Sequence, residues 1–228
     1  MFSTLKLKPC SLVFAGILVS ATTIADEHKA YVQFNAGAAF SPSFTLNEQN
    51  NNFFGSSSFS YKEDYDTGYT GSVAIGYRIA DQFRLEAEGI YQSNARNKFN
   101  ETFSFVSPNF SDSQSFSGDL KGQRERSAFL LNGYYDFKNS TAFTPFITAG
   151  MGGYHIRLKT ANGSSDNDLD FAWQAGAGVN YKLNDSISFD LKYRYFGGAD
   201  AEIKNQNGPS DLYAVGDHQA IAGIRIGF

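Results

Sequence analysis

The chain has 228 residues and a formal net charge of −4, and 16% of its residues are aromatic, with 13 Tyr and 22 Phe. Its single cysteine, Cys10, lies near the N-terminus, so the rest of the chain excludes a disulfide framework, a cysteine-ligated metal site and a cysteine nucleophile. The acidic balance gives no indication of a nucleic-acid partner.

Residues 1–25 have the pattern of a secretory signal peptide. Lys6 and Lys8 precede an apolar run, and small residues follow it. The run is shorter than the roughly 20 residues that a spanning helix needs, which disfavours the alternative of an uncleaved anchor. Cleavage after Ala21 and cleavage after Ala25 both fit the small-residue requirement. Loss of the two lysines takes the formal net charge from −4 to −6.

After this segment, apolar and polar side chains alternate along eight stretches of the chain. This is the pattern of strands with one face toward lipid and the other toward a lumen. The clearest case sets Phe83 and Leu85 against Arg84 and Glu86. The eight predicted strands are 30–40, about 68–79, 83–92, 127–137, roughly 144–157, 171–183, 187–196 and 218–228.

The fifth predicted strand, 144–157, has an ambiguous facing. Gly150, Gly152 and Gly153 blur its alternation, and such a glycine run is compatible with a β-bulge. The sequence predicts the strand but leaves open which of its side chains point toward lipid.

The connections alternate between short and long. The short ones are 80–82, 139–142 and 184–185, and the long ones are 41–67, 93–126, 158–170 and 197–217. Short periplasmic turns and long extracellular loops are typical of bacterial barrels, and a closed sheet hides its backbone polar groups from lipid. Residues 26–228 are therefore predicted to form an all-β, eight-stranded antiparallel up-and-down transmembrane β-barrel with periplasmic termini. The strand count rises by two if 41–67 or 93–126 hides a hairpin, which alternating Phe and Ser permit.

The strand sequences resemble the outer-membrane β-barrel surface-antigen family, which includes major surface antigens of rickettsia-like bacteria and is related to opacity and OmpA-type barrels. The segments that carry the resemblance are 76–78, 83–89, 131–137, 174–179 and 191–196. The resemblance covers the strands and not the long loops. It implies an integral outer-membrane surface protein in contact with outer-membrane lipid, with loops for adhesion, host contact or envelope integrity. The C-terminal Phe228 is similar to the signal that the barrel-assembly machinery recognises.

Inward-facing positions of the predicted strands carry charges of both signs. Eight strands enclose only enough space for the barrel's own side chains, and an unpaired buried charge is costly. We therefore expect these charges to pair across the lumen and plug it, and a small-solute porin or narrow channel is the alternative. The predicted lumen network comprises Arg78, Arg84, Glu86, Glu88, Asp136, Lys182, Asp190, Lys192, Arg194 and Arg225.

A lipid-modifying enzyme is a less favoured hypothesis, because such catalysis needs a histidine next to a nucleophilic serine. His28 is interpreted as a solvated flank, and His218 is adjacent to Asp217 in the sequence. The serines and acid nearest to His155 are Ser164, Ser165 and Asp166. Surface or barrel-rim positions are the preferred interpretation of all three histidines, so no catalytic residue and no cofactor is predicted.

Asp166, Asp168 and Asp170 alternate in a way that could suggest a calcium site. The run lacks the glycine and the distal glutamate of an EF-hand loop. A solvated acidic loop is the preferred interpretation, and no metal site is predicted.

The two longest loops carry spaced aromatic residues among Ser, Asn and Gly. Such a surface can contact a host or other extracellular ligand. The alternative is that the neighbouring strands extend beyond the membrane and that these rings pack against one another. The aromatic residues are Phe44, Phe53, Phe54, Phe59 and Tyr61 in the first loop and Phe99, Phe103, Phe105, Phe110 and Phe116 in the second.

Overall fold

A computed structural model describes residues 29–53, 55–160, 163–166, 169–199, 201–203, 211–213 and 216–228. The predicted signal peptide and His28 lie outside this range. Within it all regular structure is β-strand, and it contains no helix long and apolar enough to cross a membrane. The strands are β1 (Ala30–Phe40), β2 (Phe44–Asn52), β3 (Gly55–Tyr65), β4 (Gly68–Ala80), β5 (Phe83–Ser107), β6 (Phe110–Asp119), β7 (Gly122–Asp136), β8 (Phe143–Thr160), β9 (Gly163–Asp166), β10 (Asp170–Lys182), β11 (Ile187–Gly198), β12 (Ala201–Ile203), β13 (Asp211–Tyr213) and β14 (Gly216–Gly227).

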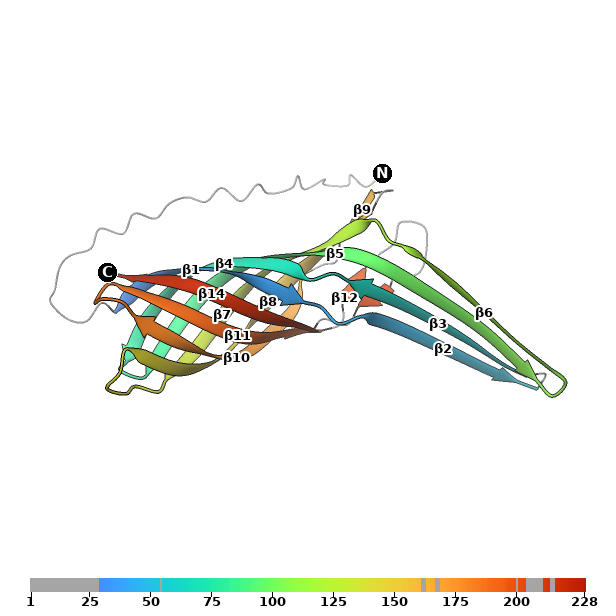
Figure 1. Ribbon diagram of the computed structural model, residues 1–228, viewed down its shortest axis with the longest axis horizontal. Helices are drawn as coiled ribbons and strands as arrows, with labels where there is room; N and C mark the ends of the chain where they lie inside the picture. Colours follow the sequence, from blue (N-terminus) through green and yellow to red (C-terminus); the bar gives the residue numbers. More distant parts are fainter. Residues whose placement is uncertain are drawn as a thin grey trace, which may run out of the picture.

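Eight strands close into a barrel, which confirms the predicted fold (Figure 1). They pair antiparallel in the order β1, β4, β5, β7, β8, β10, β11 and β14. The last strand then pairs with the first, with Val32 opposite Ile226. Closure leaves no unpaired sheet edge along the barrel, so its backbone groups are satisfied without water.

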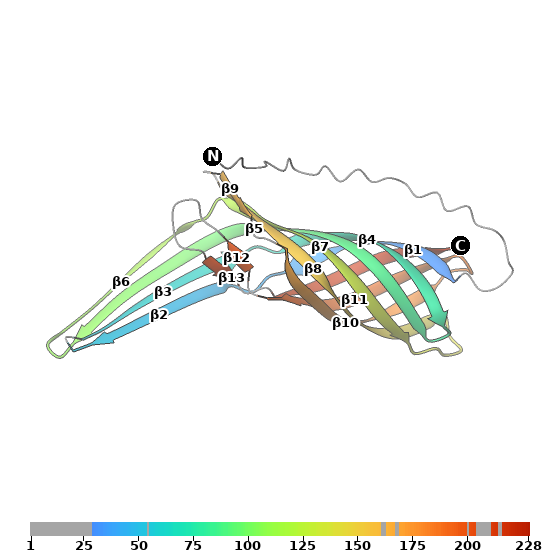
Figure 2. The same cartoon turned by 180° about the vertical axis from the view of Figure 1, so that it is seen from behind.

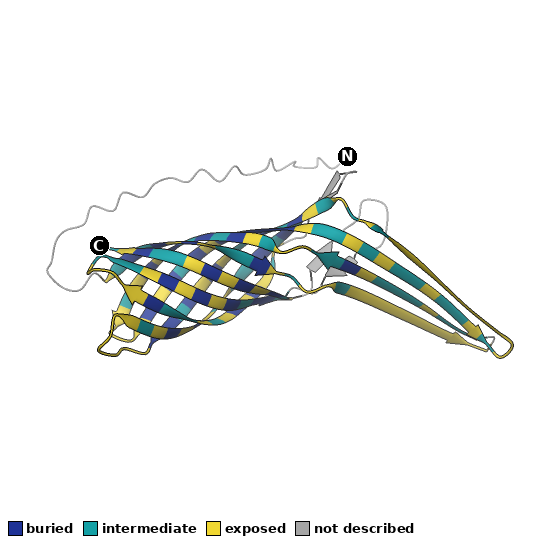
Figure 3. Ribbon diagram, in the orientation of Figure 1, coloured by how far each residue is buried: buried dark blue, intermediate teal, exposed yellow. Residues whose placement is uncertain are grey.

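Side chains alternate between the two sides of the barrel wall, and the bands of burial in Figure 3 follow this alternation. On β5 the apolar Leu85 is 53% exposed on the outside, whereas Arg84 and Glu86 are buried inside. In a water-soluble protein the leucine would be buried and the arginine exposed, so the arrangement here is the reverse. It fits a wall whose outer face meets lipid.

The structure resolves the facing of β8. Phe146, Thr148, Tyr154 and Ile156 are buried on the lumen side, whereas Met151 is exposed on the outside. The pairing of β8 with both neighbours in the barrel runs in continuous register, so the bulge considered there is absent. Register shifts occur instead next to Tyr65 and Ala80.

Outward-facing aromatic side chains gather at both ends of the barrel wall. Aromatic girdles of this kind mark the two membrane–water interfaces of such barrels, where rings with one polar end are favoured. At the end with the short turns the contacting pairs are Phe83–Tyr135 (5.1 Å between centroids), Tyr135–Phe137 (4.9 Å) and Phe143–Tyr181 (4.9 Å). At the other end they are Tyr69–Tyr91 (6.3 Å), Trp173–Tyr195 (5.5 Å) and Tyr195–His218 (5.1 Å).

Two of the long connections contain further strands. β5 continues past the barrel to Ser107, β3 and β6 pair with its two sides there, and β2 pairs with β3. We call this sheet, formed by β2, β3, residues 98–107 of β5, and β6, the platform sheet. It projects from the end opposite the short turns (Figures 1 and 2). The barrel therefore keeps eight strands, while 41–67 and 93–126 contain the additional hairpins that the sequence permitted.

Close packing against β7 explains why β8 has glycine at one of the positions that blur its alternation. A Cβ on Gly152 would lie 1.9 Å from the carbonyl oxygen of Phe129 on β7, whereas a Cβ on the outward-facing Gly89 would meet nothing within 4 Å. We expect Gly152→Ala to destabilise the barrel by about 1–3 kcal/mol because the backbone of β7 has to shift. Gly89→Ala is the matched control, and urea unfolding in lipid vesicles measures both. Equal midpoints for the two variants would contradict the expectation.

Candidate functional site

The lumen near the short turns holds an ion-paired cluster around Arg84. Its guanidinium donates to both carboxylate oxygens of Asp136, at 2.7 and 2.9 Å, and to Glu86 at 3.1 Å. The Tyr31 hydroxyl donates to the same Glu86 oxygen at 2.7 Å, and the guanidinium lies 4.3 Å from the centroid of the Tyr134 ring. Every member is buried, so one guanidinium, two carboxylates and two tyrosines fill this part of the lumen.

The middle of the lumen is organised around Glu88, which is fully buried. Arg194 donates through Nη1 to both of its carboxylate oxygens, at 3.0 and 2.9 Å. Ser72 and Asn132 also donate to Glu88, at 2.6 and 2.8 Å. Four strands, β4, β5, β7 and β11, therefore meet at a single carboxylate.

A second pair lies beside this centre. Arg225 contacts Asp190 at 2.7 Å and lies 4.9 Å from the centroid of the Tyr31 ring. Lys192 donates to the Tyr134 hydroxyl at 3.2 Å. These contacts link β11 and β14 to β1 and β7 through the inside of the barrel.

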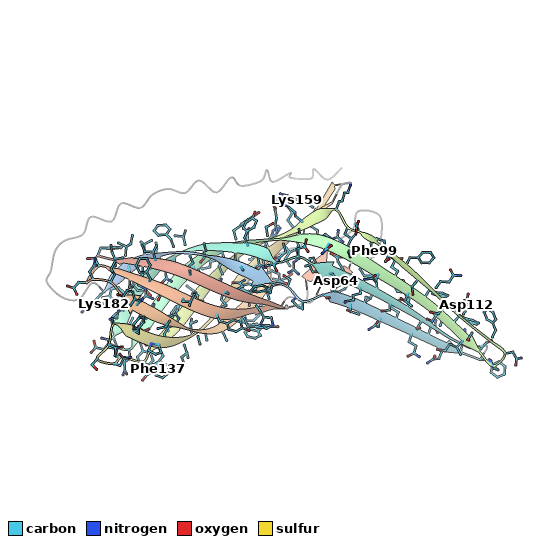
Figure 4. The ribbon with its side chains drawn as sticks, viewed as in Figure 1. Asp64, Phe99, Asp112, Phe137, Lys159 and Lys182 are labelled. Atoms are coloured by element: carbon cyan, nitrogen blue, oxygen red, sulfur yellow. The ribbon has the colours of Figure 1, made fainter. Side chains whose placement is uncertain are left out.

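Eight of the ten residues of the predicted network are buried in the lumen: Arg84, Glu86, Glu88, Asp136, Asp190, Lys192, Arg194 and Arg225. Arg78 is only half-buried, near the end of β4. The placement of Lys182 in the lumen is wrong. It is the last residue of β10, where the lumen opens to solvent, and its 54% exposed side chain pairs with Asp185 of the adjacent turn at 2.9 Å (Figure 4).

A third charge centre, which the alternation pattern did not predict, lies at the end of the lumen nearest the platform sheet. Asp217, which is fully buried, pairs with Arg124 at 2.9 Å and with Arg126, and it also accepts a hydrogen bond from Ser41. Arg124 and Arg126 fall within the predicted loop 93–126, whereas β7 begins at Gly122. Both arginines are an even number of positions from the inward-facing Asn132, and this alternation could have identified them as lumen residues.

Apolar side chains close the lumen at the same end. They form a buried cluster on the inner faces of β5, β7, β8, β10 and β11. The Arg126 guanidinium lies 3.8 Å from the centroid of the Phe196 ring of this cluster. The lumen is thus filled by ion pairs and by a hydrophobic layer that the sequence analysis did not predict. The cluster consists of Ile90, Leu130, Tyr154, Ile156, Leu158, Ala172 and Phe196, with Phe44 and Ala128 packed against it.

Among the described residues, the structure separates His218 from Asp217. Asp217 faces the lumen, whereas its neighbour His218 faces outward, with Nδ1 2.5 Å from the Tyr193 hydroxyl. His155 lies opposite Ser127 and is half-buried on the outward side of β8. The side chains of Ser164, Ser165, Asp166 and Asp168 are outside the described part of the structure. Within that part, no group of three or more His, Cys, Asp or Glu residues could hold a metal ion.

The platform sheet has two chemically different faces. Residues paired across neighbouring antiparallel strands point to the same side, so the register assigns each side chain to a face. One, the aromatic face, carries most of the large apolar side chains: Leu46, Phe59, Tyr61, Phe99, Phe103, Phe105, Phe110 and Phe116. The other, the hydroxyl face, carries mainly Ser, Thr, Asn and Gln, with hydrogen bonds between Thr102 and Ser115 and between Ser104 and Ser113.

The aromatic face is anchored to the barrel at its base. Arg96 donates to both oxygens of the fully buried Glu63, at 2.6 and 2.8 Å, and the Tyr61 hydroxyl donates to Glu63 at 3.2 Å. Burial and the neighbouring Glu63 carboxylate raise the pKa of Tyr61 to about 12, so its hydroxyl stays protonated. Phe44 packs against Tyr61 and against the apolar cluster of the barrel, which ties the platform sheet to the lumen closure.

Farther from the barrel the aromatic face is open. Phe103, Phe110 and Phe116 are 52, 59 and 61% exposed. In Figure 3 the outer strands of the platform sheet are largely exposed along their length, in contrast to the banded barrel wall. No described segment of the chain forms a second layer over this face.

The closed eight-stranded wall, its apolar exterior and its aromatic girdles define an integral outer-membrane β-barrel. In agreement, the model of a family described as the outer membrane protein beta-barrel domain matches residues 11–222, and the chain belongs to this family. The protein is therefore located in the outer membrane and contacts its lipid.

Two relatives are similar to this chain in sequence. Outer membrane protein PagN of Salmonella typhimurium is 32% identical over 169 residues, which cover 67% of this chain and 64% of PagN. The match thus spans a little less than two thirds of the length of PagN. A candidate adhesin of Rickettsia conorii is 26% identical over 224 residues, 90% of this chain and 85% of that protein.

Solved structures support the same fold. Neisserial surface protein A aligns with a TM-score of 0.56 and 16% identity, and the alignment covers 87% of this chain and 97% of that protein's chain. OprG from Pseudomonas aeruginosa aligns with a TM-score of 0.51 and 14% identity, and the alignment covers 89% of this chain and 98% of the OprG chain. At these identities the likeness concerns the barrel architecture alone.

Proposed function

We propose that the chain is a non-enzymatic adhesin-type surface protein, in which the barrel anchors the platform sheet and the aromatic face of that sheet contacts a partner outside the cell. In this orientation the short turns and both termini are periplasmic. The observation that carries the proposal is the open aromatic face, and the similarity to a candidate adhesin supports it.

The platform sheet is a single layer. A sheet with one apolar face is normally covered by a second layer, and fully burying one large apolar side chain contributes about 1.5–3 kcal/mol. Four strands of about nine residues present a face on the order of 600 Å². This is comparable to the roughly 800 Å² that each partner contributes to a standard protein interface. The face therefore has the size and composition of a binding surface.

Conduction is disfavoured by what fills the lumen. Arg194 and Glu88 meet in its centre, and the Asp217 ion pairs and the apolar cluster occupy the end nearest the platform sheet. An eight-stranded barrel has little interior space beyond its own side chains. We expect no measurable conductance from the protein in planar bilayers.

Enzymatic function is disfavoured by the positions of the described histidines. The His218 ring contacts outward-facing tyrosines and His155 lies on the outer side of β8, so neither side chain points toward the buried Asp217 in the lumen. We retain Phe228 as an assembly signal for the barrel-assembly machinery. It follows β14, and its backbone N–H donates to the Ala30 carbonyl at 3.0 Å where the barrel closes.

Replacing Phe103 and Phe116 together tests the proposal. The variant Phe103→Ser/Phe116→Ser is expected to reduce adhesion at least tenfold, because it removes two exposed rings from the centre and edge of the aromatic face. Adhesion is measured with a non-adherent bacterial strain that expresses the chain, applied to cultured animal cells. Heat-modifiable migration verifies that the barrel of each variant is folded.

Ser104→Ala/Ser113→Ala is the matched control, because these residues lie on the hydroxyl face of the same two strands. Its adhesion is expected to equal that of the unmodified chain. Undiminished adhesion of the Phe103→Ser/Phe116→Ser variant would contradict the proposed function.

A further inference from the structure

The charges on the aromatic face point to the chemistry of its partner. We infer that this face binds a cationic protein segment, one that presents Lys or Arg together with aliphatic side chains. The inference rests on the proposed function and adds to it the class of the partner.

Besides Glu63 at the base, three carboxylates lie among the rings of the aromatic face, each opposite an aromatic residue of a neighbouring strand. Glu48 pairs with Phe59, and Asp112 pairs with Phe105. Glu101 lies between two aromatic residues, Tyr61 on β3 and Phe116 on β6. Directly opposite residues have Cβ atoms about 4.5–5.5 Å apart, so a group that docks on one meets the other.

Within the platform sheet, which is described completely, the aromatic face carries no basic residue. Lys62 and Lys98 belong to the hydroxyl face, where Lys62 lies 3.3 Å from Asp64. Hydrogen bonding from Ser43 and the nearby Lys62 ammonium lower the pKa of the Asp64 carboxyl. The nearest arginine, Arg96, is held by Glu63 at the base. The three carboxylates therefore share a face without a counter-charge from this sheet.

A carboxylate next to an aromatic ring is a favourable place for a cation. The ammonium of Lys or the guanidinium of Arg is attracted to the carboxylate, and each also binds the face of an aromatic ring by about 0.5–2 kcal/mol. The aliphatic stems of these side chains cover apolar surface at the same time. One cationic side chain can thus bind both a carboxylate and an aromatic ring of this face.

The same charges exclude two other occupants. A second copy of the chain, docked face to face, would bring like charges together across the interface. A polyanion such as a sulfated glycan would meet three carboxylates and no cation on this face. Both contacts carry an electrostatic penalty, because charges within about 8 Å are poorly screened at physiological ionic strength.

The test uses the full-length protein in lipid nanodiscs and three probes. These are an amphipathic lysine–leucine peptide, a glutamate–leucine peptide of the same length, and heparin. The lysine–leucine peptide is expected to bind at least tenfold more tightly than the other two. Its affinity is expected to fall at least tenfold when the salt concentration rises from 50 to 500 mM. Equal binding of the two peptides, or preferred binding of heparin, would overturn the inference.

The variant Glu48→Gln/Glu101→Gln/Asp112→Asn assigns the binding to the aromatic face. It is expected to bind the lysine–leucine peptide at least tenfold more weakly. The control Asp81→Asn/Asp119→Asn/Asp185→Asn changes the net charge equally, but its residues lie on the hydroxyl face and at the short turns. The control is expected to bind normally, and equal affinities of the two variants would overturn the inference.

The cell-adhesion assay separates this inference from the proposed function. Loss of adhesion in both Phe103→Ser/Phe116→Ser and Glu48→Gln/Glu101→Gln/Asp112→Asn is the result expected. Loss in the phenylalanine variant alone would leave the proposed function standing and overturn the cationic partner. Normal adhesion of both variants would overturn the proposed function, and the inference with it.

Discussion

Replacing Glu88 with alanine is expected to lower the free energy of unfolding by about 3–5 kcal/mol, the cost of breaking a buried ion pair from one side. The substitution leaves the fully buried Arg194 without its carboxylate partner. It also removes the acceptor for Ser72 and Asn132, which donate from β4 and β7. The loss therefore combines an uncompensated charge with two broken hydrogen bonds.

Urea titration in lipid vesicles, followed through the fluorescence of Trp173, measures this change. Lys182→Ala is the control, because its exposed pair with Asp185 is worth only about 0–1 kcal/mol. The double variant Glu88→Met/Arg194→Met replaces both charges by apolar side chains and is expected to recover most of the stability. A Glu88→Ala variant as stable as the Lys182→Ala control would show that the central ion pair does not hold the barrel together.

Replacing Asp217 with alanine is expected to have an effect of similar size, about 3–5 kcal/mol. The variant leaves Arg124 and Arg126, two positions apart on the inner face of β7, facing one another without the shared carboxylate. It also removes the acceptor of the Ser41 hydroxyl, directly after β1, so that Ser41 keeps only the hydrogen bond that it accepts from Arg124. Besides a lower urea midpoint, we therefore expect faster proteolysis at 41–43, where the chain enters the platform sheet.

Glu125→Ala is the matched control for this second prediction. Glu125 lies between Arg124 and Arg126 on β7 but faces outward, where it pairs with the half-exposed Lys159 at 2.6 Å. Its removal is expected to cost about 0–1 kcal/mol. If Asp217→Ala changed the midpoint no more than Glu125→Ala does, the carboxylate would have no structural role at the closed end of the lumen.

Alternation within each strand allowed much of the barrel to be predicted. The facing of Arg84, Glu86 and Glu88 follows from their spacing of two, because successive side chains of a strand point to opposite sides whatever its neighbours are. On β8 the alternation is not visible, because its glycines carry no side chain to show a face. There the facing came from register, with Tyr154 opposite the inward side of β7 at Ala128.

Lys182 shows the limit of the alternation. It has the parity of an inward residue, but at the end of β10 the lumen gives way to water, and a long side chain there pairs with the turn instead. Arg124 and Arg126 show the converse error. They have the parity of inward residues, but they fall within the predicted loop 93–126, whereas β7 begins at Gly122.

The sequence by itself determined the class of protein, the eight barrel strands and the side of the wall on which most charges lie, because these depend on a local period of two. Only the tertiary structure decided which charges meet, since Glu88 and Arg194 are 106 residues apart and come together through barrel closure and register. It also decided that the aromatic residues of two separate loops form one face. That face exists because β3 pairs with the extension of β5, a contact between segments that no local pattern specifies.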